Sequence, residues 1–156
     1  MKKVNLSPVD INQKDIDSVV TSLKSGWLAH GEENKLFEKE FAEYLDVKKA
    51  ISLNSCTSAL DLALRCHKFP PGSEVIILSF TWVSTGNVVI LNNLIPVFAD
   101  INLCDYQIDP KSILDLITSK TVAVIGVHFS GLMCDIVEIK KICELNNLVF
   151  IEDSAE

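Results

Sequence analysis

The chain has 156 residues, of which 48% are hydrophobic and 22% are charged, and its formal net charge is −7. These values are typical of one globular domain or of part of a larger one, and the acidic balance excludes a non-specific nucleic-acid binder, which needs a basic face. The most apolar run, residues 88–99, is interrupted by Asn92, Asn93 and Pro96, so it is too short to span a membrane.

The five cysteines and three histidines show no metal-binding pattern. No C-x-x-C pair occurs and the histidines are far apart in the sequence, which excludes the usual zinc spacing. The first residues carry no signal-peptide pattern. We therefore expect a cytoplasmic protein whose thiols are reduced and which holds no metal.

The beginning of the chain predicts an extended arm and two amphipathic helices. Residues 1–11 have the pattern of an arm, and Asn12, with Asp15 at the capping-box position, predicts a helix that runs to about Ser25. A loop with an exposed-looking tryptophan follows at 27–31, and a second helix is predicted over residues 34–45.

From residue 49 onward, short apolar runs alternate with helical patterns. Strands are predicted at 50–53, 75–79, 97–100, 122–127 and 148–152, and helices at 57–66, 83–91, 110–118 and 136–145. Asp109 with Pro110, and Asp135 with Glu138, supply helix start signals. Such alternation predicts an α/β fold: a mostly parallel sheet flanked by helices, in three layers α/β/α.

Parallel sheets bind ligands at the carboxyl ends of their strands. Polar residues and one large aromatic follow the predicted strands at 54–58, 80–82, 100, 128–131 and 153–156. We therefore expect these segments to meet at one edge of the sheet.

Three of these segments have a recognisable chemistry. The turn at residues 54–58 offers backbone N–H groups and hydroxyls to an anion such as phosphate. Alternatively, Ser55 or Asn54 could simply cap the next helix. Neither a Walker A loop nor a G-x-G-x-x-G motif is present. Trp82 could form a flat platform for a heteroaromatic ring, or it could be part of the core.

Asp153 follows an apolar strand, where a carboxylate needs a cation or several donors. A pyridinium nitrogen would supply a charge-assisted hydrogen bond, and holding that nitrogen protonated makes the ring an electron sink, as pyridoxal chemistry requires. The alternative is that Asp153 caps a following helix. Together, the turn, the indole and the carboxylate match the phosphate, ring face and ring nitrogen of one cofactor.

From about Ser25 to Glu156, the order and spacing of these residues resemble the N-terminal part of the DegT/StrS family of sugar-nucleotide aminotransferases, which are fold type I pyridoxal-phosphate enzymes. The motifs that carry the resemblance are Ser25-Gly26-Trp27-Leu28, Phe37-Glu38-x-x-Phe41, Asn54-Ser55-Cys56-Thr57-Ser58-Ala59-Leu60, Thr81-Trp82-Val83-Ser84-Thr85-x-Asn87, Pro96-Val97-Phe98-x-Asp100, Val127-His128-x-x-Gly131 and Ile151-Glu152-Asp153-Ser154-Ala155-Glu156. The sequence of residues 81–85 is most similar to that of family members that aminate 4-keto-pentose nucleotides for lipid A modification.

The resemblance implies pyridoxal 5′-phosphate as the cofactor. It places Thr57, Ser58 and the backbone of Cys56 at the cofactor phosphate, although Cys56 stands where Gly or Ala is usual. It places Trp82 against the pyridine ring and Asp153 at the ring nitrogen.

Other positions follow from the same resemblance. Glu156 stands where relatives often carry His or Gln near the O3′ side of the cofactor. Trp27 and Leu28 would line the entrance for the sugar nucleotide. The implied reaction transfers an amino group from glutamate to a 4-keto or 3-keto nucleotide sugar, in polysaccharide or lipopolysaccharide biosynthesis, and the implied assembly is a homodimer.

In this family the Schiff-base lysine lies a few tens of residues after the aspartate, and residues 1–156 contain none at such a position. We therefore expect an N-terminal fragment: an arm and first helix in residues 1–33, and an incomplete large domain in residues 34–156, with no catalytic residue of its own and no activity by itself. Two alternatives stay open, namely a non-catalytic α/β binding module and an inactive partner of a full-length relative.

Overall fold

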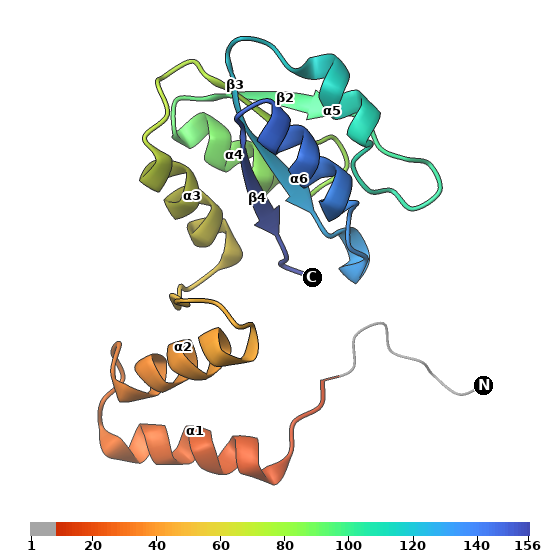
Figure 1. The fold of residues 1–156 in the computed structure, drawn as a ribbon. Helices are drawn as coiled ribbons and strands as arrows, with labels where there is room; N and C mark the ends of the chain where they lie inside the picture. The colour runs from red at the N-terminus through yellow and green to blue at the C-terminus, as the bar shows by residue number, and fades with distance from the viewer. Residues whose placement is uncertain (1–8) are drawn as a thin grey trace, which may run out of the picture. The chain divides into compact units, whose positions relative to one another are not determined.

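The computed structural model describes residues 9–156 and divides the chain into two compact units (Figure 1). The first unit ends at Ser52, and the second runs from Leu53 to Glu156. Residues 1–8 of the predicted arm lie outside the described residues. The domain boundary predicted after residue 33 stays a prediction.

The first unit consists of two helices joined by a loop, α1 (Gln13–Ser25) and α2 (Glu32–Tyr44). The predicted capping box is present at the start of α1, where the Asn12 side chain accepts from the Lys14 N–H at 2.9 Å and the Asp15 carboxylate accepts from the Asn12 N–H at 2.9 Å. Helix α2 begins two residues earlier than predicted because Gly31 is its N-cap and Asn34 accepts from the Gly31 N–H. Neither helix has a buried residue.

The strand predicted at residues 50–53 is not formed, and the prediction was wrong. Apolar residues favour a strand only where a neighbouring backbone can pair with them, and within residues 9–156 no strand pairs with this segment. Instead, the backbone N–H and the hydroxyl of Ser52 both donate to the carboxylate of Glu38 at 2.8 Å. These two bonds, the backbone one foremost, lower the pKa of Glu38.

The second unit contains a parallel sheet of four strands in the order β2-β1-β3-β4. The strands are β1 (Glu74–Leu78), β2 (Ile95–Ala99), β3 (Thr121–Val127) and β4 (Val149–Asp153), so four of the predicted strands are confirmed with limits that shift by one or two residues. The interiors of β1 and β3 are buried on both faces, as expected where helices cover both sides of a parallel sheet.

Helices lie on both faces of this sheet (Figure 1). On one face, α3 (Cys56–His67) and α4 (Val83–Leu91) pack on Val75, Ile77 and Ile125. On the other face, α5 (Pro110–Leu116) and α6 (Ile136–Leu145) pack on the alternate residues Ile76 and Val124, because successive strand side chains point to opposite faces. The predicted three-layer α/β/α architecture is therefore confirmed.

The arrangement brings several chain segments to the carboxyl edge of the sheet. Helix α4 begins there because it follows β1 directly, and the short 3-10 helix η1 (Phe129–Gly131) follows β3 at the same edge. Helix α3 also begins there, since its first residue bonds to the last residue of β4. The carboxyl edge is thus lined by two helix N-termini and by the loops after the strands.

Candidate functional site

Asp153, the last residue of β4, is a buried carboxylate at the carboxyl edge of the sheet and is 5% exposed. Its Oδ1 accepts from the Cys56 thiol at 3.3 Å and from the Ala155 N–H at 3.2 Å, and its Oδ2 accepts from the Thr85 hydroxyl at 3.3 Å. Within residues 9–156, no Lys, Arg or His forms an ion pair with it. The carboxylate is therefore held by three neutral donors.

Two of these donors lie at helix starts. Cys56 is the first residue of α3 and Thr85 is the third residue of α4. The unpaired N–H groups of a helix N-terminus attract negative charge by roughly 0.3–1 kcal/mol at an exposed site. The start of each helix therefore adds a favourable field at Asp153.

Thr85 is the residue of this site that sequence reasoning missed. Its side chain is fully buried, and its hydroxyl lies 3.1 Å from that of Thr81. A signal was present in the sequence, because Thr85 stands three and four positions before Val88 and Val89 and so shares their buried face of the helix. A buried hydroxyl on such a face needs a partner, and here the partner is Asp153.

The turn at residues 54–58 makes its own hydrogen-bond network. Ser55 caps α3 by accepting from the Ser58 N–H at 3.1 Å, which confirms the capping interpretation of this residue. The Ser58 hydroxyl donates to Asn54 Oδ1 at 2.8 Å. In the described part of the chain, the N–H groups of Cys56 and Thr57 have no acceptor, so they remain available to an anion.

Trp82 is the N-cap residue of α4, and its side chain is 77% exposed. The alternative that this tryptophan belongs to the core is therefore wrong. Its carbonyl accepts from the Thr85 N–H at 3.1 Å, so the exposed indole is joined through one turn of α4 to the residue that contacts Asp153.

The Cys56 thiol is neutral in this setting. Burial first, and then the hydrogen bond and the charge of Asp153, raise the pKa of Cys56 from 9.0 to about 11. A thiol that keeps its proton can donate to a carboxylate, whereas a thiolate would repel it. The cysteine that stands where Gly or Ala is usual therefore acts here as a hydrogen-bond donor to Asp153.

Glu156 and the loop after β3 form a second group at the same edge. The Glu156 carboxylate accepts from the backbone N–H of Ser130, which has a left-handed backbone (φ 58°). His128 is buried, and its Nδ1 accepts from the Cys134 N–H at 3.3 Å. The ring proton must then lie on Nε2, which donates to Glu152 at 3.1 Å. These bonds connect the loop after β3 to the end of β4.

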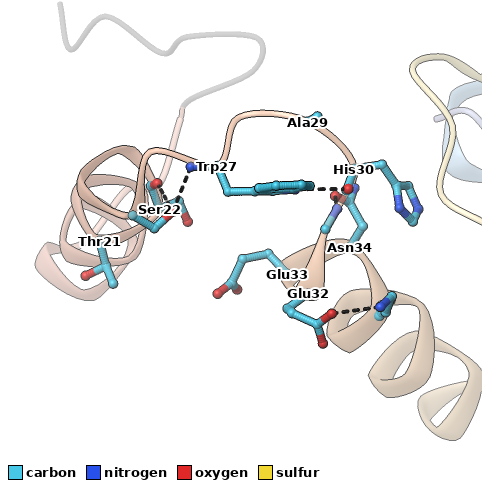
Figure 2. A pocket seen from close by; sticks show the side chains of 11 residues that line it. Thr21, Ser22, Trp27, Ala29, His30, Glu32, Glu33 and Asn34 are labelled. Carbon is cyan, nitrogen blue, oxygen red and sulfur yellow. Dashed lines mark hydrogen bonds and ion pairs between the residues drawn. The ribbon is translucent and has the colours of Figure 1, made fainter.

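Trp27 and Leu28 belong to the first unit, at the loop between α1 and α2. A hollow of about 500 Å³ lies between the end of α1 and the start of α2. Trp27 is among the residues that line it, as Figure 2 shows. Its indole N–H donates to the His30 carbonyl at 3.1 Å, and a Cβ at Gly31 would come within 2.6 Å of the ring. Leu28 is 74% exposed and is not among the residues that line this hollow.

No helix within residues 9–156 is long and apolar enough to cross a membrane. No group of three or more His, Cys, Asp or Glu residues in the described range is placed to hold a metal ion. All five cysteines are free in the structure.

Known proteins are similar to this chain in sequence and in fold. A profile of the DegT/DnrJ/EryC1/StrS aminotransferase family matches residues 9–156. The spore coat polysaccharide biosynthesis protein SpsC of Bacillus subtilis is 41% identical over 145 residues, which cover 93% of this chain and 37% of SpsC. Helicobacter pylori PseC, an aminotransferase involved in the biosynthesis of pseudoaminic acid, is structurally similar with a TM-score of 0.92 and 32% identity, over 98% of this chain and 42% of PseC.

A third relative was solved with cofactor. The PLP-form of the putative sugar aminotransferase Spr1654 from Streptococcus pneumoniae is similar with a TM-score of 0.87 and 32% identity, over 99% of this chain and 39% of that one. The chain thus spans about two fifths of the length of the relatives it matches. It belongs to the DegT/DnrJ/EryC1/StrS aminotransferase family.

Proposed function

We propose that the second unit is the cofactor-binding part of a pyridoxal 5′-phosphate-dependent sugar aminotransferase. The observation that carries the proposal is the buried carboxylate of Asp153, which has three neutral donors and, within residues 9–156, no ion-pair partner. Family membership and the PLP-form of a relative support it.

The residues fit this cofactor in three respects. A protonated ring nitrogen is the kind of partner that a buried carboxylate without a cation favours. The exposed indole of Trp82 offers a flat face for the ring. The open N–H groups of Cys56 and Thr57 at the start of α3 are suited to the phosphate, and the Ser58 hydroxyl is proposed to turn from Asn54 Oδ1 to join them.

When bound, the pyridoxal ring supplies an electron sink for amino transfer. Asp153 accepts the N–H of the ring and so keeps that proton in place, Trp82 covers one face of the ring against water, and the start of α3 anchors the phosphate. Glu156, which bonds to the loop after β3, is proposed to lie at the O3′ side of the cofactor.

Amino transfer by the whole protein also needs a lysine at the cofactor. Within residues 9–156, no lysine forms a hydrogen bond or an ion pair with Asp153 or Thr85, and Lys140 and Lys141 are exposed on α6. We therefore propose that residues 1–156 bind the cofactor without turnover, and that the lysine comes from the part of the relatives' length that these residues do not span.

The substrates are proposed from the relatives. SpsC is a polysaccharide biosynthesis protein and PseC acts in the biosynthesis of pseudoaminic acid, so an activated keto sugar, in the form of a 4-keto or 3-keto nucleotide sugar, is the proposed acceptor and glutamate the proposed donor. Trp27, which lines the hollow of the first unit (Figure 2), and Leu28 beside it are proposed to contact the sugar nucleotide. The homodimer and the cytoplasmic location stay predictions.

The test uses pyridoxamine 5′-phosphate, which has the ring nitrogen and the phosphate but cannot condense with surface lysines. The chain has two tryptophans, so in a Trp27→Phe background Trp82 is the only indole. When the ligand ring stacks on Trp82, the tryptophan fluorescence should be quenched, and the quenching should saturate as the ligand is titrated. Asp153→Asn should weaken binding by about tenfold or more, because a hydrogen bond between charged groups is worth roughly 1.5–3 kcal/mol.

The control is Asp115→Asn, which changes the net charge by the same amount at an exposed position on α5 and should leave the affinity unchanged. Equal weakening by both variants would mean that general electrostatics, and not a contact at Asp153, governs binding. The absence of saturable binding would contradict the proposal and favour a non-catalytic α/β binding module.

A further inference from the structure

The two oxygens of Asp153 are not equivalent. Oδ1 accepts from both the Cys56 thiol and the Ala155 N–H, whereas Oδ2 accepts only from the Thr85 hydroxyl, at 3.3 Å. A carboxylate oxygen has about two lone-pair positions for hydrogen bonds. Both positions on Oδ1 are therefore filled, and one on Oδ2 is left.

The direction of the hydroxyl bonds at Oδ2 follows from counting protons. An ionised carboxylate can only accept, so the single proton of the Thr85 hydroxyl must point to Oδ2. The Thr85 oxygen is then an acceptor for the Thr81 hydroxyl, which lies 3.1 Å away. Because Thr85 is fully buried, water cannot replace it, and the two hydroxyls form one chain that ends on Asp153.

We infer that Thr85, supported by Thr81, is a positioning residue that orients the Asp153 carboxylate and leaves Oδ2 as the oxygen that accepts the ring N–H of the cofactor. Thr85 acts through Asp153 and not on the cofactor itself. The inference rests on the proposed function of this site. It adds a residue and an orientation that neither the sequence pattern nor the family match assigns.

The test compares Thr85→Val, which keeps the shape of the side chain but removes the donor, with Thr85→Ser, which keeps the donor. The matched control is Thr121→Val, since the Thr121 hydroxyl also donates to a carboxylate at 3.3 Å, that of Glu74, at the opposite end of the strands. Thr85→Val should weaken the binding of pyridoxamine 5′-phosphate about tenfold, or ~1.4 kcal/mol. The dissociation constants of Thr85→Ser and Thr121→Val should stay within about twofold of that of the unchanged chain.

A second ligand separates positioning from packing. In the carbocyclic analogue of pyridoxamine 5′-phosphate, a C–H group replaces the ring nitrogen, so no N–H is present for Asp153 to accept. The difference between Thr85→Val and the unchanged chain should then disappear. If Thr85→Val proves unable to fold, Thr81→Val, which removes only the donor to Thr85, should weaken pyridoxamine 5′-phosphate binding about threefold.

The outcomes distinguish this inference from the function on which it rests. If Asp153→Asn weakens binding and Thr85→Val does not, the positioning role is overturned and the proposed function stands. If Thr85→Val weakens binding of the carbocyclic analogue to the same extent, the hydroxyl acts through packing, and the inference is again overturned. If the unchanged chain binds neither compound, the proposed function fails and the inference fails with it.

Discussion

Gly126, in the middle of β3, gives a sharp test of the packing that positions the site. It pairs with Glu152 in β4, the residue before Asp153. A Cβ at Gly126 would lie 2.9 Å from Cε2 and 3.2 Å from Cζ of Phe150, and 3.2 Å from the sulfur of Cys134. Because real Cβ atoms essentially never come this close to a ring atom, Gly126→Ala must displace the Phe150 ring or the strand that carries it.

The expected cost combines two terms of opposite sign. Overpacking a close-packed core costs about 1–3 kcal/mol, and the smaller conformational freedom of alanine in the unfolded chain returns about 0.4–1 kcal/mol. The midpoints of these ranges give a net loss for Gly126→Ala of about 1.3 kcal/mol. In a unit of roughly 100 residues, this lowers Tm by about 5–10 °C.

The assay is urea and thermal denaturation of the chain, with Gly86→Ala as the control. At Gly86, within α4, a Cβ would meet only Ile77 Cδ1 at an ordinary 3.6 Å, so alanine should stabilise the helix by about 0.5–1 kcal/mol. Phe150→Leu removes the ring atoms that clash, and the double variant should recover about 1 kcal/mol relative to the sum of the two single changes. A Gly126→Ala chain as stable as the unchanged one, or the absence of this coupling, would refute the reasoning.

Three further predictions concern a helix cap, a buried histidine and the buried thiols. Asn12→Ala removes the cap of α1 and should lower the protection of its first amides from hydrogen exchange by about 1 kcal/mol; unchanged protection would contradict the cap. His128→Ala leaves the buried Cys134 N–H without its acceptor and should cost about 1–3 kcal/mol in urea denaturation, whereas His128→Asn, whose oxygen can take the place of Nδ1, should recover most of this; equal losses would exclude the bond. Burial raises the pKa of Cys56, Cys134 and Cys143 from 9.0 to about 11, so the folded state keeps protons that the unfolded state loses as the pH rises. The contribution of these thiols to the free energy of unfolding, measured under reducing conditions, should be constant below about pH 9 and fall as the pH rises toward 11; a flat profile between about pH 9 and 11 would show that these thiols are not buried.

Most elements of the second unit could be predicted because local signals determine their limits. The helices predicted over 83–91 and 136–145 coincide with α4 and α6, and in α6 the Asp135 side chain accepts from the Glu138 N–H as the capping pattern predicts. The segment at 50–53 failed because a strand depends on a partner backbone, which a local apolar pattern does not reveal. Its Ser52 N–H bonds to a carboxylate on α2 instead.

The candidate site was predictable in part for the same reason. The rule that parallel strands collect ligands at their carboxyl ends predicted Cys56 and Asp153 at one edge, and they do meet there although they are 97 positions apart in sequence. Cys56 reaches that edge as the first residue of α3, because the strand predicted before it is not formed. Thr85 could not be matched to Asp153 in this way, because its helical spacing with Val88 and Val89 indicates a buried hydroxyl but does not identify the partner, which lies 68 positions away. That contact depends on how α4 packs across the sheet onto the end of β4.

The way in which Asp153 is buried separates its contribution to folding from its contribution to binding. Three neutral donors and two helix starts surround the carboxylate in the folded chain without a ligand. Folding therefore already orients the carboxylate, and a cationic ring can bind to it without a further loss of side-chain entropy at Asp153. Asp153→Asn keeps an oxygen for the thiol and the Ala155 N–H, and its NH2 group can donate to the Thr85 oxygen in place of the original bond. This variant should therefore change the free energy of unfolding by less than about 1 kcal/mol, whereas Asp153→Ala leaves the thiol, the hydroxyl and the N–H without an acceptor and should cost about 1–3 kcal/mol. Both variants should lose affinity for pyridoxamine 5′-phosphate, since neither carries the charge that the ring N–H requires. Denaturation and titration of the same two proteins measure the two effects, and an Asn variant that unfolds as readily as the Ala variant would show that the negative charge, and not the acceptor oxygens, holds this end of β4 in place.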